Sequence, residues 1–311
     1  MKLFVGIKDL DDLPPLIAEG AEEFYTGFLE EGTAGTRSHY KASAGLRTRD
    51  QLHRALEVAH AAGAKLHIAI NTIYYGEREL AGLADRVEDV VRQGVDGIIV
   101  GSVPLLIQLG PRRLPTEICL STLQPAFTGE ALRFFKQFGL TRIALPDHVG
   151  AYEIPDILAD PDIKTETLFW PTSMHFFTES FCVFHHLRRV YLNVDDQAPF
   201  DYCLERPVIK TPGGRDDPES MALFERLFDG YRCYRINDSY NIYDLHRLGL
   251  DYLKLGTREF SRAGKIAAVR VANHCRALLA DPAIGRDDFV RLLQEKVDQF
   301  PRDAFHVAMT D

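Results

Sequence analysis

Thiol side chains gather in one segment of the chain, residues 171–251. This segment contains Cys182, Cys203 and Cys233, together with a group of histidines. Thiolates that meet at one centre select zinc or an iron–sulfur cluster over magnesium or calcium. The segment contains no Cys-x-x-Cys pair, however, and unrelated buried cysteines are the simpler interpretation of the spacing. The spacing alone therefore favours a structural role and leaves a metal site open.

Polar residues also follow or close several apolar runs. They are Tyr25, Asn71, Ser102, Ser121, Gln124, Asp147, Lys254 and Arg258. Asn71 and Gln124 can donate and accept hydrogen bonds at once. Arg258 could bind a carboxylate through two parallel hydrogen bonds, and Lys254 could act as a point charge. We take Asn71, Gln124, Lys254 and Arg258 as candidate catalytic residues; the structural alternatives are helix capping for Asn71 and an ion pair for the two cations.

These residues need a scaffold, and the order of apolar and amphipathic stretches predicts one. Eight β-rich runs alternate with helical patterns, several of them apolar throughout, as strands buried on both faces should be. The runs cover residues 3–7, 23–28, 66–71, 97–102, 118–122, 142–146, 166–170 and 252–256. This alternation predicts a single (β/α)8 barrel over residues 1–311, with functional groups at the carboxyl ends of its strands. An open doubly wound sheet is the alternative, but no Gly-x-Gly-x-x-Gly follows the first run.

The helical patterns have recognisable ends. Thr48 and Gln51 have the spacing of a capping box before a helix that ends near residue 62. Further helices are expected over residues 78–94, 129–139, 242–249, 262–280 and 286–300, the last packed outside the barrel. The segment 171–251 interrupts the regular alternation between the seventh and eighth strands. A connection of this length in a compact domain is usually functional, and strand seven would deliver it to the barrel mouth.

Composition narrows the class of protein. The chain has 311 residues, of which 46% are hydrophobic and 26% charged, which is typical of a water-soluble globular domain. Its formal net charge of −9 argues against a broad nucleic-acid surface. No apolar run approaches the roughly 20 residues that span a bilayer, and the amino terminus turns polar too early for a signal peptide, so we expect a cytoplasmic protein. Disulfides are then not expected, and we assign Cys119 and Cys275 to packing.

Five segments of the chain carry a family pattern when taken together and in order. They are residues 21–27, 65–72, 120–124, 143–146 and 251–258. With them the chain resembles peptidase family U32, the collagenase-like group that includes the ubiquinone-biosynthesis proteins UbiU and UbiV. The resemblance extends through most of the chain.

The resemblance implies a 4Fe-4S cluster, which four cysteines hold in the UbiU-like members. The second, third and fourth cluster positions fall on Cys182, Cys203 and Cys233, whereas the first falls on His175. His175 can be an imidazole ligand to iron, as in Rieske centres, or part of a zinc site with the three thiolates. It can also be a core histidine in a site that has lost its metal. We rank the 4Fe-4S cluster first among the three.

The resemblance also implies a reaction: oxygen-independent hydroxylation that depends on the iron–sulfur cluster. We expect a small or lipid-like substrate of the quinone-precursor type, and the negative charge makes nucleic acid a less suitable partner. The alternative is a non-catalytic partner of a second U32 family subunit. A peptidase is a further alternative, although the sequence has neither a Gly-x-Ser-x-Gly nor a His-Glu-x-x-His motif. A nucleophile formed by Cys182 and a nearby histidine would be needed instead.

Overall fold

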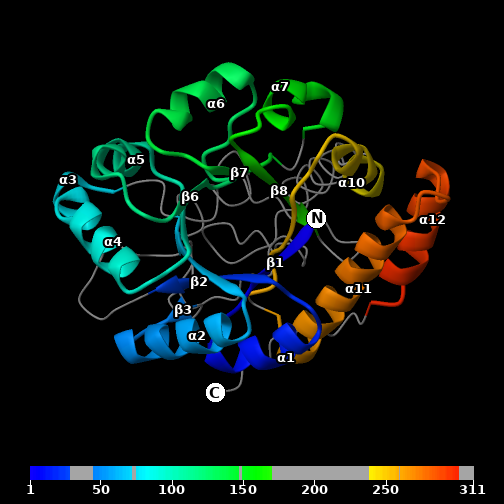
Figure 1. Ribbon diagram of the computed structural model, residues 1–311, viewed down its shortest axis with the longest axis horizontal. Helices are drawn as coiled ribbons and strands as arrows, with labels where there is room; N and C mark the ends of the chain where they lie inside the picture. The colour runs from blue at the N-terminus through cyan, green and yellow to red at the C-terminus, as the bar shows by residue number, and fades with distance from the viewer. Residues whose placement is uncertain (29–44, 72–74, 147–148, 170–237, 259, 301–311) are drawn as a thin grey trace, which may run out of the picture.

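Eight parallel strands close into a barrel in the computed structural model (Figure 1). The structure describes residues 1–28, 45–71, 75–146, 149–169, 238–258 and 260–300. The barrel strands are β1 (Lys2–Gly6), β2 (Glu23–Phe28), β4 (Lys65–Ile70), β5 (Gly97–Val100), β6 (Glu117–Leu120), β7 (Arg142–Ala144), β8 (Lys164–Phe169) and β9 (Tyr252–Leu255). β1 pairs with both β2 and β9, which closes the ring. The (β/α)8 barrel and all eight expected strands are confirmed.

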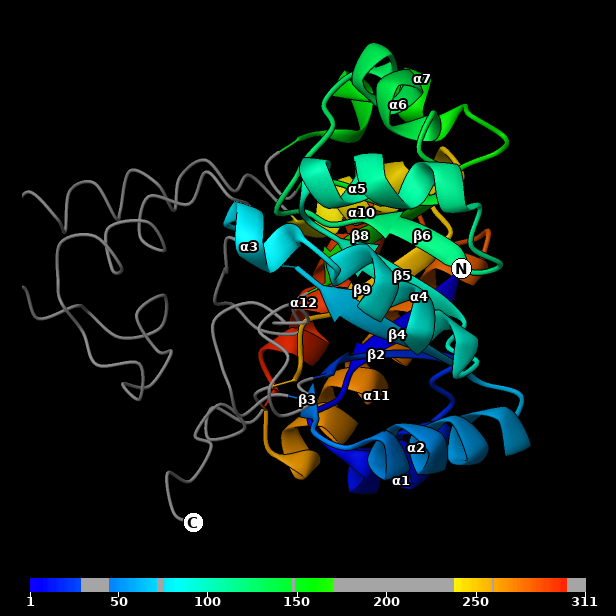
Figure 2. The same cartoon turned by 90° about the vertical axis from the view of Figure 1, so that its left-hand side faces the viewer.

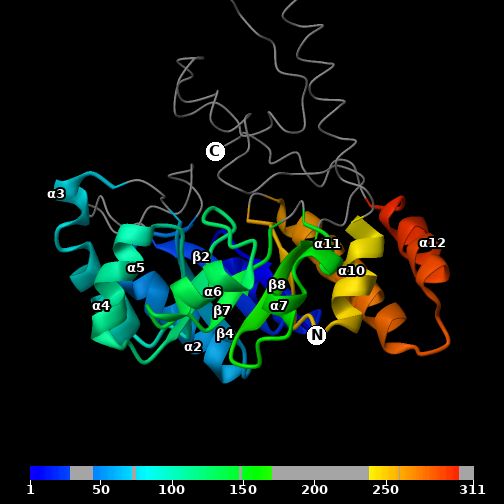
Figure 3. The ribbon, with the colours of Figure 1, turned by 90° about the horizontal axis from the view of Figure 1, so that it is seen from above.

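Helices surround the barrel on its outer side (Figures 1 and 2). They are α1 (Leu13–Ala18), α2 (Arg49–Ala61), α3 (Glu77–Leu80), α4 (Leu83–Arg92), α5 (Val103–Leu109), α6 (Gly129–Lys136), α7 (Pro155–Leu158), α10 (Asp238–Arg247), α11 (Arg262–Ala280) and α12 (Arg286–Val297). Short 3-10 helices are η1 (Leu10–Asp12), η2 (Gly110–Arg112) and η3 (Ala151–Glu153). α12 packs outside α10 and α11, as expected from the sequence (Figure 3). Within the described residues, no helix has the length and apolar character needed to cross a membrane.

Two local details differ from the expectation. The helix expected over residues 78–94 is divided into α3 and α4, because Gly82 between them has a φ of 72°, a left-handed conformation that ends a helix. At the start of α2, the Thr48 hydroxyl accepts from the Gln51 amide at 3.2 Å, whereas the Gln51 side chain accepts from the Arg47 amide at 2.7 Å. The cap at Thr48 is therefore confirmed, but the return bond of the capping box goes to Arg47 instead.

The two faces of each strand pack in different surroundings, because successive side chains point to opposite sides of a sheet. On β4, Leu66, Ile68 and Ile70 belong to the large core between barrel and helices. His67 and Ala69 face the barrel interior instead, where a smaller apolar cluster lies. That cluster contains Phe4, Tyr25, Ala69, Ile99, Cys119 and Tyr252. The remaining interior positions are largely charged, and they form the site described below.

Gly97 provides the space that the His67 ring occupies. Pairing of β5 with β4 places Gly97 opposite His67, and a methyl group at Gly97 would overlap the imidazole. Gly97→Ala is therefore expected to lower the free energy of unfolding by about 1–3 kcal/mol, the usual cost of overpacking a core. Urea denaturation measures this loss. In a Gly97→Ala/His67→Ala double variant the loss should be smaller than the sum of the two single losses, and strict additivity would contradict the overlap.

Candidate functional site

Six ionisable side chains form a connected network inside the barrel. They are Glu23, His67, Glu117, Arg142, Glu166 and Lys254, from six different strands, and we call them the interior ion network. Arg142 and Glu166 have no exposed surface, and Glu23 is 1% exposed. Charges this deeply buried are tolerated only when they are paired. The network therefore has to be complete for the barrel to be stable.

Arg142 is the centre of the network. Its Nη1 donates to Glu23 Oε2 at 2.8 Å and to Glu117 Oε1 at 3.0 Å. Its Nε lies 2.6 Å from Glu166 Oε2. The guanidinium also lies 3.6 Å from the centre of the Tyr252 ring. The Tyr252 hydroxyl donates a hydrogen bond to Glu23 Oε1 at 3.1 Å. One arginine thus joins three carboxylates that are far apart in the sequence.

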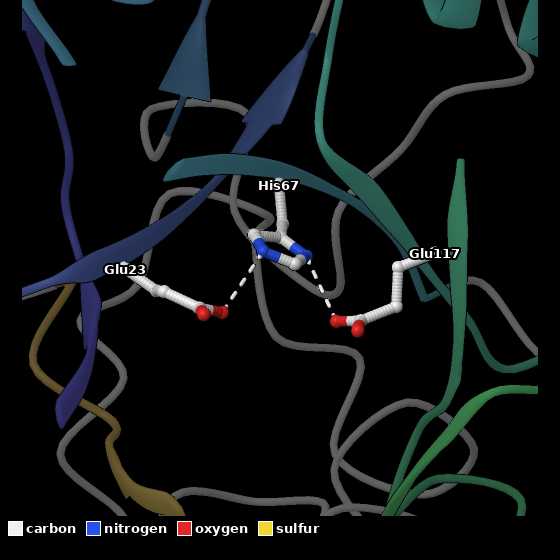
Figure 4. Close-up of side chains that lie close together, drawn as sticks. All are labelled: Glu23, His67 and Glu117. Carbon is white, nitrogen blue, oxygen red and sulfur yellow. Dashed lines mark ion pairs between the residues drawn. The ribbon is translucent and has the colours of Figure 1, made fainter. Parts of the chain in front are cut away.

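His67 lies between two carboxylates, as Figure 4 shows. Its Nε2 is 3.2 Å from Glu23 Oε2, and its Nδ1 is 3.9 Å from Glu117 Oε1. Among the described residues, this trio is the group whose ligand atoms, all within 4.8 Å of one another, could hold a metal ion. However, Arg142 Nη1 donates hydrogen bonds to these same two carboxylate oxygens. The guanidinium already supplies the positive charge, and the trio does not fit a metal.

Lys254, Arg258 and Tyr25 come together at the carboxyl end of the barrel, and we call them the mouth cluster. Lys254 Nζ donates to Glu166 Oε1 at 2.5 Å and lies 5.0 Å from the centre of the Tyr25 ring. Arg258 follows β9, and its Cζ lies 5.7 Å from the same ring centre. The Tyr25 hydroxyl donates to the Leu255 carbonyl at 3.0 Å, which fixes the ring between the two cations. Two cations thus lie on one aromatic ring where barrel enzymes carry their active sites.

Opposite charges in the interior ion network stabilise one another in their ionised forms. Burial alone would raise the pKa of Glu166, but the ammonium of Lys254 and the guanidinium of Arg142 hold that pKa below its ordinary value. Burial would also raise the pKa of Glu23, yet His67 and Arg142 hold it well below the usual range. For Lys254 the signs are reversed: burial opposes the charge, and the Glu166 carboxylate raises the pKa above the ordinary value. Glu23, Glu166 and Lys254 are therefore ionised near neutral pH.

Acid should unfold the protein through these carboxylates. The folded-state pKa values of Glu23, Glu117 and Glu166 lie below the unfolded value of about 4.3, so their contribution is complete above that pH and is lost as pH falls below it. We expect the urea midpoint to change little between about pH 7 and 5 and to fall steeply below about pH 4. A midpoint that stays level down to about pH 3 would contradict this assignment. In Glu117→Gln the fall should be shallower, because one of the three titrating groups is absent.

The structure places the four predicted catalytic residues at the carboxyl ends of three strands. Lys254 and Arg258 belong to the mouth cluster, and Lys254 pairs with Glu166 rather than with Arg258. Asn71 directly follows β4 and is partly buried, with its Oδ1 inaccessible to solvent. Gln124 lies beyond the end of β6, where its backbone N–H donates to the Ser121 carbonyl at 2.9 Å. The two amides therefore have the expected location, and their roles stay predictions.

The predicted cluster ligands His175, Cys182, Cys203 and Cys233 lie outside the described residues, as does most of the segment 171–251. The described part contains two cysteines, both free and fully buried. Cys119 faces the barrel interior and Cys275 packs from α11 against the outer core. Burial raises the pKa of both thiols, so neither is suited to supply a thiolate ligand.

Sequence reasoning missed five of the six members of the interior ion network. The signal was present: in β4 the polar residue His67 alternates with the apolar residues Leu66 and Ile68, and several other strands combine charged and apolar positions in the same way. Such alternation indicates that one face of a strand has a polar environment. In a barrel, that face can only be the interior.

Comparisons with known proteins found a matching family model, similar sequences and similar solved structures. The model of peptidase family U32 matches residues 8–301. The tRNA hydroxylation protein P1 of Bacillus subtilis (strain 168) is 29% identical over 167 residues, 53% of this chain and 37% of the relative. The tRNA hydroxylation protein P2 of the same organism is 24% identical over 165 residues, 53% of this chain and 50% of the relative. The chain thus spans half or less of the length of these relatives. A solved U32 peptidase structure is 15% identical, with a TM-score of 0.42, over 54% of this chain and 68% of that one.

Proposed function

The chain belongs to peptidase family U32, and from this premise we propose that it takes part in a hydroxylation reaction at the carboxyl-terminal mouth of its barrel. The names of two relatives, both tRNA hydroxylation proteins, support the reaction class. The mouth cluster is the observation that supports this location of the reaction site. Lys254 and Arg258 lie on the Tyr25 ring, at the end of the barrel where such folds bind their substrates.

The residues of the mouth have complementary roles in this proposal. Arg258 and Lys254 bind an anionic group of the substrate or co-substrate, since both place positive charge beside the Tyr25 ring. Tyr25 provides a flat apolar surface for an unsaturated ring. Asn71 and Gln124 orient the substrate, because an amide side chain can donate and accept hydrogen bonds at once.

The proposed cofactor is a 4Fe-4S cluster held by His175, Cys182, Cys203 and Cys233, with zinc as the alternative. When bound, such a cluster supplies electron transfer to the reaction. The chemistry of the donor set supports it, because three thiolates and one imidazole suit a soft metal centre. Elemental analysis of anaerobically purified protein tests this proposal. Cys182→Ala should lose iron, whereas Cys275→Ala, a buried cysteine of α11, should keep it.

The proposed substrate is small or lipid-like, of the quinone-precursor type. The net charge of −9 supports it over a polyanion, because nucleic-acid binding requires clustered positive charge. A tRNA nucleoside is the second candidate, and the names of the relatives favour it. The two relatives named P1 and P2 come from one organism, which also favours a second U32 subunit as partner of this chain.

A gene deletion in the source organism, grown without oxygen, separates these candidates. Mass spectrometry of quinone intermediates and of digested tRNA would identify which hydroxylated product disappears and which returns on complementation. Loss of a hydroxylated quinone precursor supports the first substrate, and loss of a hydroxylated nucleoside the second. Unchanged profiles of both would overturn the proposed function. Affinity purification from the same cells tests for the second subunit.

A further inference from the structure

Glu166 lies between two buried cations and uses one carboxylate oxygen for each. Its Oε1 accepts from Lys254 Nζ at 2.5 Å, and its Oε2 lies 2.6 Å from Arg142 Nε. Glu166 and Arg142 have no exposed surface, whereas Lys254 is 7% exposed at the barrel mouth. We infer that Glu166 and Arg142 are positioning residues that hold Lys254 as a fixed positive charge at the mouth. This inference rests on the proposed function, in which Lys254 contacts an anionic group.

The geometry distinguishes two chemical roles for a buried lysine. A lysine that acts as a base or forms a Schiff base must lose its proton near neutral pH, which burial or a neighbouring cation achieves. Lys254 instead has a carboxylate at 2.5 Å, and that carboxylate is held in turn by Arg142. An opposite charge at this distance favours the ammonium form. The arrangement therefore assigns Lys254 an electrostatic role and not that of an amine nucleophile.

Glu166 is the group that stabilises the ammonium form of Lys254, as the other groups around this lysine show. The charged and titratable groups around it are Glu166 from β8, Arg142 from β7, Cys119 from β6, Tyr25 from β2 and Arg258 after β9. Burial raises the pKa of both Tyr25 and Cys119, so these two groups are neutral near pH 7. Arg142 and Arg258 are cations, which oppose the ammonium. Among these groups, Glu166 is the anion that stabilises it.

The test is a titration of Lys254 in the full chain, which requires no substrate. Lysine carrying ¹³C at Cε reports its own protonation by NMR, and Lys254→Met identifies the signal. In the wild type we expect Lys254 to titrate at a higher pH than an ordinary lysine, because Glu166 stabilises its ammonium form. In Glu166→Gln, which keeps the shape but removes the charge, its titration should move down by about two pH units or more. A midpoint within half a unit of the wild type would overturn the inference.

Glu117→Gln is the matched control, because Glu117 also binds Arg142 but lies at the opposite end of the barrel and pairs with Lys164. It should leave the Lys254 titration nearly unchanged; an equal shift in both variants would show a general effect of lost charge. If Glu166→Gln does not fold, Glu166→Asp provides the same test, since its shorter side chain withdraws the carboxylate from Lys254.

Activity provides a second, separable readout. Lys254→Arg keeps the charge but cannot form a Schiff base, so it should retain at least a tenth of the hydroxylation rate. A rate as low as that of Lys254→Met would overturn the electrostatic role. If the wild type itself has no hydroxylation activity, the proposed function fails, whereas the titration still decides whether Glu166 holds Lys254 charged.

Discussion

Replacing Arg142 by methionine is expected to lower the free energy of unfolding by about 3–5 kcal/mol, the cost of removing one partner from a buried ion pair. Methionine fills a similar volume but leaves Glu23 and Glu166 buried without the guanidinium they share. At neutral pH these carboxylates then have to take up protons or water. Urea denaturation at pH 7, followed by circular dichroism, measures the loss.

Arg112→Met is the matched control for this variant. Arg112 also contacts two carboxylates, those of Asp85 and Glu88, at 2.6 Å each, but it lies on the surface with 29% of its side chain exposed. Exposed ion pairs contribute about 1 kcal/mol or less, so the control should lose little stability. If both variants lost the same free energy of unfolding, burial would not be the reason that Arg142 contributes to stability.

Replacing Lys254 by methionine is expected to lower the hydroxylation rate by about 100-fold or more, the usual cost of removing one preorganised charge from an active site. The loss should appear mainly in kcat if the charge acts in the transition state, and mainly in KM if Lys254 only binds the substrate. The assay is product formation by mass spectrometry under anaerobic conditions, at a substrate concentration series.

Lys164→Met is the control for that rate measurement. Lys164 also pairs with a carboxylate of the interior ion network, Glu117, at 2.5 Å, but it does so at the amino ends of the strands. Its removal should affect stability more than the rate per folded molecule. An equally large rate loss in Lys164→Met would mean that the mouth cluster is not the site of the reaction.

The barrel could be predicted from the sequence because the outer faces of most strands are apolar. On β5, Ile98 and Val100 pack outward against the helices, and similar runs recur in the other strands. Helix boundaries were less predictable. A periodic apolar pattern continues across Gly82, and only the left-handed backbone at that glycine divides α3 from α4. The two-residue strand β3 (Gly45–Leu46) is too short to produce a pattern.

The interior ion network could not be predicted as a unit because its partners are distant in the sequence. Arg142 and Glu23 are 119 residues apart, and Lys254 and Glu166 are 88 residues apart. Only closure of the barrel brings them together. Lys254 and Arg258 could be identified from the sequence because Lys254 lies near the end of an apolar run and Arg258 follows it. The partner of Lys254 could not be identified in this way. A sequence shows that a charge lies on a buried strand without showing what compensates it.

The short strand β3 has a consequence for where the chain tolerates a change in length. Gly45 lies so close to Gly27 that a side chain at position 45 would meet the backbone of β2, and the pairing holds residues 27–28 beside residues 45–46. The two ends of the segment between β2 and β3 are therefore held next to each other by strand pairing. Doubling the length of chain between two such points costs only about 0.6 kcal/mol of closure entropy. Changes in the number of residues between Phe28 and Gly45 should therefore cost little stability, provided that Gly45 is retained.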